Sequence, residues 1–329
     1  MFNLFNKKRK YLDCPFMKHS LHFFHKAVCT CSHNAKGPVF YKNYKGAPID
    51  LDYIYETRKK YIKKINSPFS KRNIPLSCQK CTELNNFLSD KKVENFDNKI
   101  DRVYFHNTLV CNAKCTYCTY NYFSRNVKYE VLPVVKEMIQ REILSRDAMI
   151  YMSGGEITIN SDFEELLFLL LNYLNSKIEI LTSGIKYCNS IEEAFKKDRC
   201  RLLISIDSGQ RETYKKIKQV DCFDILVDNI RNYIKASDNA KSNIILKYII
   251  VDDVNDNLNE IEKFINLVVE LGITTVRLDF DYEKYKLFGD LNLPSHYLDL
   301  INRFNELTKQ YSLNVEKNDY VEAILKKKL

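Results

Sequence analysis

From residue 100 onward, short apolar runs alternate with longer amphipathic segments, and this alternation constrains the fold more than any other feature of the sequence. The short runs have the length and residue types of β-strands, whereas the longer segments repeat apolar residues at helical spacing. Regular alternation of strand and helix is typical of parallel βα units. Strands are expected at residues 102–107, 148–152, 177–181, 201–206, 244–251 and 275–280. Helices are expected at residues 132–144, 162–175, 190–197, 210–217, 224–236, 258–271 and 295–311.

Three cysteines follow the first of these strands with the spacing C-x3-C-x2-C, at Cys111, Cys115 and Cys118. Thiolates are common ligands of iron-sulfur clusters, and a 4Fe-4S cluster normally takes four cysteines. Three cysteines on one loop, with no fourth close by, would leave one iron open to a small molecule. The alternatives are a zinc knot or thiols that are close by chance, but zinc sites favour paired C-x2-C spacings. The sequence therefore predicts a cluster-binding loop.

A second group of cysteines precedes the alternating region. The chain has eleven cysteines, and five of them lie between residues 14 and 81. These five are Cys14, Cys29, Cys31, Cys78 and Cys81. Because the cytoplasm keeps thiols reduced, their grouping indicates metal or cluster ligation rather than disulfides. The isolated Cys188, Cys200 and Cys222 are interpreted as small buried hydrophobic residues.

The segment that carries this second group has its own pattern. Two β-rich runs joined by a polar turn with Asn34 and Gly37 predict a hairpin. A helix is expected over residues 49–65, with Asp50 or Asp52 as its N-terminal cap.

The composition excludes some classes of protein. With 329 residues, 45% apolar and 28% charged, the chain resembles an ordinary globular protein with one large core. No run of about 18 apolar residues occurs, so no membrane span is expected. The N-terminal residues lack the order and the cleavage site of a signal peptide, which predicts a cytoplasmic protein. The net charge of +9 is spread along helices as Lys-Lys pairs, so a nucleic acid partner is not the favoured interpretation.

Polar and glycine residues gather where the predicted strands end, and in barrels of parallel strands the functional residues lie at that end. The second strand ends in Gly154-Gly155-Glu156, where glycines permit close approach of a ligand and a carboxylate can bind an ammonium group. Ser183 follows the third strand, and Ser205 and Asp207 end the fourth. The alternative for Gly-Gly-Glu is a simple turn, and for Asp207 a helix cap.

The last two strands carry charged residues between apolar ones. Lys247 lies in the fifth strand, and Arg277, Asp279 and Asp281 alternate with apolar residues in the sixth. Such alternation places one set of side chains inside the barrel. These residues either bind substrate or form ion pairs within the barrel.

The loop from Cys111 to Cys118 resembles the signature of the radical S-adenosylmethionine (SAM) superfamily, in which an aromatic residue, here Tyr117, precedes the last cysteine. Asn112 also fits the wording that is common in that family. The resemblance implies an α/β fold with a partial (β/α)6 TIM-like barrel, preceded by a small cysteine-rich domain of β-hairpin and helix. The implied domains are an auxiliary domain at 1–97, the barrel at 98–290 and a C-terminal helical segment at 291–329 that packs on the barrel.

The same resemblance implies ligands for the site residues. Cys111, Cys115 and Cys118 would bind the 4Fe-4S cluster on which SAM sits. Gly154, Gly155 and Glu156 look like the family motif that holds the amino group of SAM. Tyr117 and Ser183 would face SAM, and Ser205 and Asp207 would contact its carboxylate or ribose region.

The N-terminal cysteines resemble half of the family's auxiliary-cluster domain, called a twitch, although its usual place is after the barrel. This resemblance implies a second 4Fe-4S cluster held by Cys14, Cys31, Cys78 and Cys81, with Cys29 as the alternative to Cys31. A structural zinc held by the same thiols, with His22 or His25, is the competing interpretation.

The implied activity is reductive cleavage of SAM to a 5'-deoxyadenosyl radical that takes a hydrogen atom from a substrate. The expected partners are a reductant such as flavodoxin or ferredoxin and a peptide or sugar-like small molecule. Two alternatives are an RNA-modifying enzyme of the same family and a non-catalytic iron-sulfur sensor of redox state or iron. No catalytic acid or base is identified from the sequence.

Overall fold

The computed structural model describes part of the chain in two compact units. Unit 1 comprises Met1–Thr108, Val127–Gly154 and Asn172–Ser176, and unit 2 comprises Leu109–Asn126, Gly155–Leu171 and Lys177–Leu329. Within these ranges the structure describes residues 10–24, 27–31, 39–42, 48–65, 76–79, 81, 84–91, 97–119, 130–281, 294–316 and 321. None of the helices in this described part is long and apolar enough to cross a membrane.

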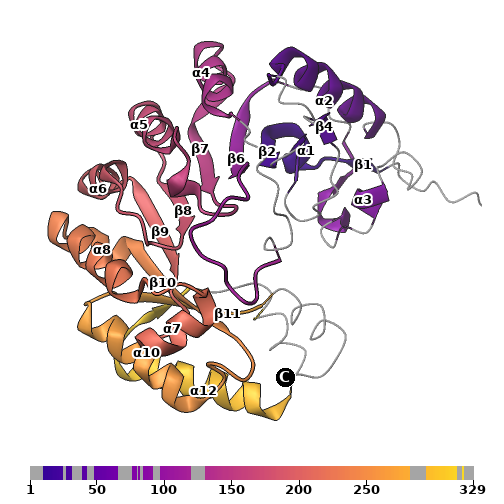
Figure 1. The fold of residues 1–329 in the computed structure, drawn as a ribbon. Coiled ribbons are helices and arrows are strands. Elements are labelled where there is room, and N and C mark those ends of the chain that lie inside the picture. Colours follow the sequence, from indigo (N-terminus) through magenta and orange to yellow (C-terminus); the bar gives the residue numbers. More distant parts are fainter. Residues whose placement is uncertain are drawn as a thin grey trace, which may run out of the picture. The chain divides into compact units, whose positions relative to one another are not determined.

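Unit 1 is built on parallel strands that continue into antiparallel ones (Figure 1). Strand β6 pairs in parallel with both β7 and β2, and β2, β3 and β4 follow one another as antiparallel neighbours. The strands of this sheet are β2 (Ser20–Phe24), β3 (Ala27–Cys29), β4 (Val39–Lys42), β6 (Ile100–His106) and β7 (Leu144–Met152). The other elements are β1 (Tyr11–Leu12), β5 (Leu88–Ser89), α1 (Pro15–His19), α2 (Leu51–Ile65), α3 (Leu76–Gln79), a 3-10 turn at Leu84–Phe87 and α4 (Leu132–Gln140).

The N-terminal cysteine-bearing segment agrees with the predicted hairpin and helix. Strands β3 and β4 pair antiparallel, whereas the predicted turn residues Asn34 and Gly37 lie outside the described residues. Helix α2 begins two residues later than predicted, because the Asp50 carboxylate accepts the backbone N–H of Tyr53 at 3.0 Å and so caps it. The parallel pairing of β2 with β6 was not predicted.

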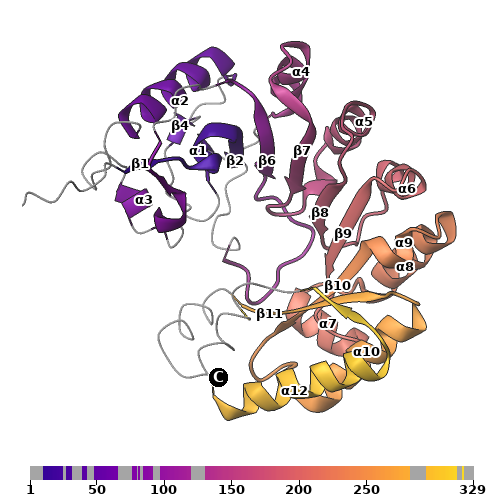
Figure 2. The same ribbon diagram turned by 180° about the vertical axis from the view of Figure 1, so that it is seen from behind.

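Unit 2 consists of parallel strands in the order β8, β9, β10, β11, β12. Helices α6, α8, α10 and α12 lie along one side of these strands (Figures 1 and 2). The strands are β8 (Ile178–Thr182), β9 (Cys200–Ser205), β10 (Ile244–Ile250), β11 (Thr275–Phe280) and β12 (Asn314–Val315). The helices are α6 (Asn189–Lys196), α7 (Arg211–Lys218), α8 (Phe223–Ala236), α9 (Ala240–Asn243), α10 (Leu258–Glu270) and α12 (Ser295–Gln310), with a 3-10 turn at Ile157–Ile159. Helix α5 (Phe163–Tyr173) begins in unit 2 and ends in unit 1.

The strands of unit 2 separate an apolar face from a charged one. Tyr248 of β10 packs against Phe264 of α10, with ring centroids 5.0 Å apart, so this face meets the helices. Lys247, one residue earlier, is in register with Arg277 of β11 and points to the opposite face. The predicted α/β fold with a mostly parallel sheet is confirmed. The charged face of unit 2, opposite the helices, is called its inner face below.

The ends of several elements differ from prediction for local reasons. The predicted helix 132–144 ends at Gln140, because Glu142 takes a positive φ of 54° and turns the chain into β7, which therefore starts four residues early. The short helix α9 was not predicted. The C-terminal segment at 291–329 was expected to be helical, and its described part contains helix α12 followed by the unpredicted strand β12, which pairs with β11.

Candidate cofactor site

The segment after β6 carries three cysteines, and the charges of Cys115 and Cys118 act on the Cys111 thiol. The pKa of the Cys111 thiol is raised to about 11, mainly by burial. The Ala113 N–H lowers this pKa, and the charges of Glu156, Cys115 and Cys118 contribute to raising it. Cys118 is turned back over Cys115 by a backbone N–H to C=O bond of 3.0 Å. A bound metal removes the proton from each thiol that ligates it, so this set of neighbouring sulfurs suits a cluster.

Glu156 is an acceptor for four protein donors. It is 1% exposed, and its Oε1 accepts the Thr158 N–H at 3.2 Å, the Thr158 hydroxyl at 2.6 Å and the Thr182 hydroxyl at 2.7 Å. Its Oε2 accepts the backbone N–H of Ser183 at 2.5 Å. The Ser183 hydroxyl in turn donates to the Asn112 side chain at 3.0 Å. Glu156 therefore joins the end of β8 to the cysteine loop.

The glycines before Glu156 are required by the chain's own backbone. A Cβ at Gly155 would lie 2.3 Å from the Val110 carbonyl oxygen, and a Cβ at Gly154 would lie 2.8 Å from the Thr108 carbonyl oxygen. The Glu156 N–H also donates to the Val110 carbonyl at 2.7 Å. The start of the cysteine loop thus packs directly against Gly154-Gly155-Glu156. The motif therefore positions the loop in addition to turning the chain.

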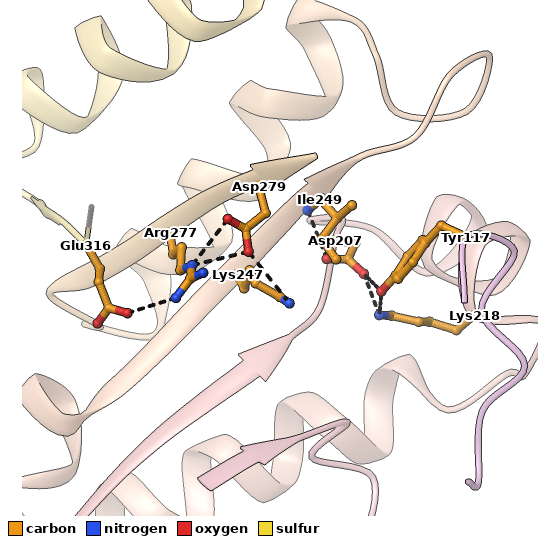
Figure 3. A network of polar contacts seen from close by, with 8 residues as sticks. All are labelled: Tyr117, Asp207, Lys218, Lys247, Ile249, Arg277, Asp279 and Glu316. Carbon is orange, nitrogen blue, oxygen red and sulfur yellow. Dashed lines mark hydrogen bonds and ion pairs between the residues drawn. The ribbon is translucent and has the colours of Figure 1, made fainter. Parts of the chain in front are cut away.

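Asp207 lies at the centre of a buried polar cluster (Figure 3). Its Oδ2 accepts the Tyr117 hydroxyl at 2.6 Å and also pairs with the Lys218 ammonium, while its Oδ1 accepts the Ile249 N–H at 3.0 Å. Burial is the largest single influence on the pKa of Lys218 and lowers it, but the Asp207 carboxylate together with the charges of Cys115 and Cys111 raises the pKa overall. The N-cap of α7 is Gln210, so Asp207 does not cap that helix.

Ser205 lies on the charged inner face, in register with Lys247. On that face Arg277 contacts Asp279 at 3.2 Å and Glu316 at 3.3 Å, and Lys247 lies 3.8 Å from Asp279 (Figure 3). Arg201 completes the network by pairing with Glu179 at 3.3 Å and with Glu316. The described part of this network therefore pairs three cations with three carboxylates, as the ion-pair interpretation of the strand charges requires.

Three of the N-terminal cysteines are neighbours in unit 1. Burial raises the pKa of Cys14 to about 12, and the charges of Cys31 and Cys78 raise it further, against backbone donors that lower it. Cys81 lies one turn after Cys78, to whose carbonyl its N–H donates at 3.1 Å. The Cys29 thiol faces the His22 carbonyl at 3.8 Å. The charges of Cys31 and Cys78 thus act on Cys14, although these residues are distant in the sequence.

The N-terminal thiols were interpreted either as ligands of a 4Fe-4S cluster or as ligands of a zinc ion together with His22 or His25. Among the residues that the structure describes, no three His, Cys, Asp or Glu side chains converge on one point as ligands of a single ion would. His22 contacts His106 through a ring-to-ring hydrogen bond, and burial lowers the pKa of His22 to about 3, with the His106 charge as a smaller cause. His25 lies outside the described residues.

Comparison with known proteins identifies a domain in part of the chain. The family model described as "Radical SAM superfamily" matches residues 108–268. This region is a radical SAM domain. The match begins just before the three-cysteine loop and ends within helix α10, so it includes the loop, Glu156 and Asp207.

Individual relatives are distant. A "Probable GTP 3',8-cyclase" of Saccharolobus islandicus (strain Y.N.15.51 / Yellowstone #2) is 24% identical over 231 residues, covering 67% of this chain and 71% of the relative. Streptococcus suis SuiB has a TM-score of 0.52 at 14% identity, covering 84% of this chain and 58% of SuiB, and SuiB has also been solved with its precursor peptide SuiA. Native anSMEcpe with bound AdoMet has a TM-score of 0.50 at 16% identity, covering 65% of this chain and 62% of anSMEcpe. The chain thus spans about three fifths of the solved structures it matches.

Sequence reasoning missed one partner of the cysteine loop. Lys218 was not singled out, although its ammonium pairs with Asp207 and donates to Tyr117, which were. Lys218 is one of 51 basic residues and ends an amphipathic helix, where lysines are common, so nothing local distinguished it. The contact of Lys218 with Asp207 forms only when the chain is folded, so the sequence gives no sign of it.

Replacing Glu156 with glutamine is expected to destabilise the metal-free chain by about 1–3 kcal/mol, because the new amide NH2 faces donors and leaves a buried group without an acceptor. Urea unfolding of the variant and the parent measures the difference. Glu212→Gln, at an exposed position of α7, is the matched control and should unfold like the parent. Equal midpoints for Glu156→Gln and Glu212→Gln would show that Glu156 is not the acceptor described here.

Proposed function

We propose that the chain is a radical SAM enzyme that binds SAM at a 4Fe-4S cluster held by Cys111, Cys115 and Cys118. When bound, the reduced cluster supplies the electron that cleaves SAM to methionine and a 5'-deoxyadenosyl radical, which takes a hydrogen atom from the substrate. The observation that carries this proposal is the loop itself, whose three neighbouring thiols leave a fourth ligand position to be filled from outside the loop.

The chain's own residues have supporting roles in this proposal. The Gly154-Gly155-Glu156 motif fixes the start of the loop, and Asp207 fixes its end through Tyr117. Ser183 and Ser205 remain our candidates for contact with SAM, since both are only partly buried and lie where β8 and β9 end. Glu156 and Asp207 already accept several protein donors, so we assign them mainly to holding the site.

A second 4Fe-4S cluster in unit 1 is also part of the proposal. Cys14, Cys31, Cys78 and Cys81 would hold it, supported by the mutual influence of the Cys14, Cys31 and Cys78 charges. A twitch-like domain of this kind would accept an electron from the substrate radical or bind the substrate. The external one-electron donor would be of the flavodoxin or ferredoxin class, which implies a cytoplasmic enzyme.

For the substrate we favour a peptide, by analogy with SuiB, whose structure holds a precursor peptide. The second candidate is GTP, because curated relatives bear the name GTP 3',8-cyclase. Recognition of a triphosphate requires cations that are free to meet it. The Arg201, Lys247 and Arg277 side chains on the described inner face are each already paired with carboxylates, which favours a substrate of low charge.

The test is SAM binding and its response to substrate. The reconstituted, unreduced parent should bind about one SAM per chain in equilibrium dialysis, as one open iron requires. Added GTP should leave 5'-deoxyadenosine formation by the reduced enzyme at its uncoupled rate, whereas peptides encoded beside the gene should raise it. Stimulation by GTP alone would overturn the peptide assignment, and absence of SAM binding would overturn the proposal as a whole.

A further inference from the structure

The end of helix α7 and the cysteine loop are joined along their backbones. The Lys114 N–H donates to the Lys218 carbonyl at 2.9 Å, and the Thr116 N–H donates to the Ile217 carbonyl at 2.9 Å. Carbonyls in the last turn of a helix have no partner within the helix, so the loop supplies donors to them. The middle of the loop is therefore hydrogen-bonded to the last turn of α7.

The side chains strengthen this contact. The Tyr117 ring packs against Ile217, Ile249 and Val251, and the Lys218 ammonium lies 5.3 Å from the centroid of that ring. The same ammonium donates to the Tyr117 hydroxyl at 2.9 Å. The Lys218 side chain is thus fixed beside Tyr117, which lies between Cys115 and Cys118 in the sequence.

Asp207 holds the lysine in this place, and it is itself held rigidly. Its φ of 58° lies in the left-handed region, and the Asn255 amide donates to its carbonyl at 2.7 Å. The Lys218 side chain is 3% exposed and that of Asp207 is 0% exposed. Burial of two charges in a protein is costly even when they are paired, so a pair at this position calls for an explanation other than stability.

Both charges lie beside the loop that carries the thiols. Lys218 is joined to that loop in two ways, since its carbonyl accepts the Lys114 N–H at 2.9 Å and its ammonium donates to the Tyr117 hydroxyl at 2.9 Å. Asp207 reaches the loop through the same hydroxyl, which it accepts at 2.6 Å.

We propose that Lys218 is a positioning residue that raises the reduction potential of the cluster on the Cys111–Cys118 loop, with Asp207 and Tyr117 fixing its ammonium. This inference rests on the cluster assigned above. An electron from the external donor adds negative charge to the cluster, and a cation fixed in a low-dielectric surrounding stabilises that added charge. Charge and hydrogen bonding around the cluster are established determinants of its potential.

The test is a redox titration of the reconstituted protein followed by electron paramagnetic resonance. The signal of the loop cluster is identified as the one that changes on addition of SAM, and its midpoint is measured without SAM. Lys218→Met should retain iron and lower the midpoint, by about tenfold in the reduction equilibrium constant, which is about 59 mV for one electron. Lys218→Arg, which keeps the charge, should return most of the shift.

Asp207→Asn is the matched variant with the opposite sign. It removes the carboxylate and leaves the cation, so the midpoint should rise, whereas a purely structural role would make both variants lose iron alike. If Lys218→Met folds poorly, the double variant Lys218→Met with Asp207→Asn removes both charges, and its midpoint should lie below that of Asp207→Asn, which keeps the cation. Unchanged midpoints in variants that retain iron and cleave SAM would overturn this inference alone. Loss of SAM cleavage in the parent would instead overturn the proposed function.

Discussion

Replacing Cys111, Cys115 and Cys118 together with alanine is expected to lower the iron content from about eight to about four atoms per chain, as removal of one of two 4Fe-4S clusters requires. It should also abolish SAM cleavage. The physical reason is that these three cysteines are the proposed ligands of the loop cluster, and the second cluster proposed for unit 1 would have no open iron. Iron and sulfide assays on protein purified without oxygen measure the loss.

A matched control for this variant is Cys200→Ala, which removes a fully buried thiol of β9. It should retain the iron content of the parent, because that sulfur faces the apolar core of unit 2. If the triple variant carries zinc and almost no iron, the N-terminal cysteines form a zinc knot and the second cluster must be abandoned. An undiminished iron content in the triple variant would contradict the assignment of the loop.

Replacing Gly155 with alanine is expected to displace the cysteine loop. The new Cβ would lie 2.3 Å from the Val110 oxygen and 2.7 Å from the Leu109 carbonyl carbon, and both contacts are with backbone that a rotamer change cannot relieve. Overpacking of this kind costs about 1–3 kcal/mol. Because the displaced segment leads directly into Cys111, we also expect a loss of iron from the loop and at least about a tenfold fall in SAM cleavage, as 1.4 kcal/mol of distortion would produce.

Gly272→Ala is the control that separates collision from backbone strain. Gly272 has a φ of 68°, but a Cβ there would meet nothing closer than the Lys241 side chain at 3.8 Å. This variant should lose some stability in urea unfolding and keep its full iron content. A Gly155→Ala variant with the stability, iron and turnover of the parent would show that the loop does not rest on this motif.

The fold was predictable because its strands and helices are encoded by local patterns. The alternation of apolar runs and amphipathic segments predicted β8 to β11 within a residue or two at most ends, and the alternating charges of Arg277 and Asp279 predicted their inward orientation. The pairing of β2 with β6 could not be predicted, because parallel partners far apart in the chain leave no local signal. The predicted end of α4 was wrong because Glu142 has a left-handed backbone conformation, which glutamate rarely adopts.

The parts of the candidate site that form short sequence motifs could be predicted. Cys111, Cys115, Cys118 and the Gly154-Gly155-Glu156 motif could be named from their spacing. What they contact could not, because Glu156 meets Thr182, and Asp207 meets Lys218, only when distant segments are folded together. Sequence reasoning assigned Asp207 a contact with SAM, and its position beneath Tyr117 gives it a second role in holding the loop.

The central claim is that this chain cleaves SAM at a cluster on the three-cysteine loop. The most direct test reconstitutes the chain with iron and sulfide in the absence of oxygen, adds SAM and dithionite, and measures 5'-deoxyadenosine by liquid chromatography and mass spectrometry. The parent should form 5'-deoxyadenosine and methionine in equal amounts, and Cys118→Ala should form neither above the level of a protein-free control. Equal formation of 5'-deoxyadenosine by Cys118→Ala and the parent, or none by a fully iron-loaded parent that binds SAM, would contradict the claim.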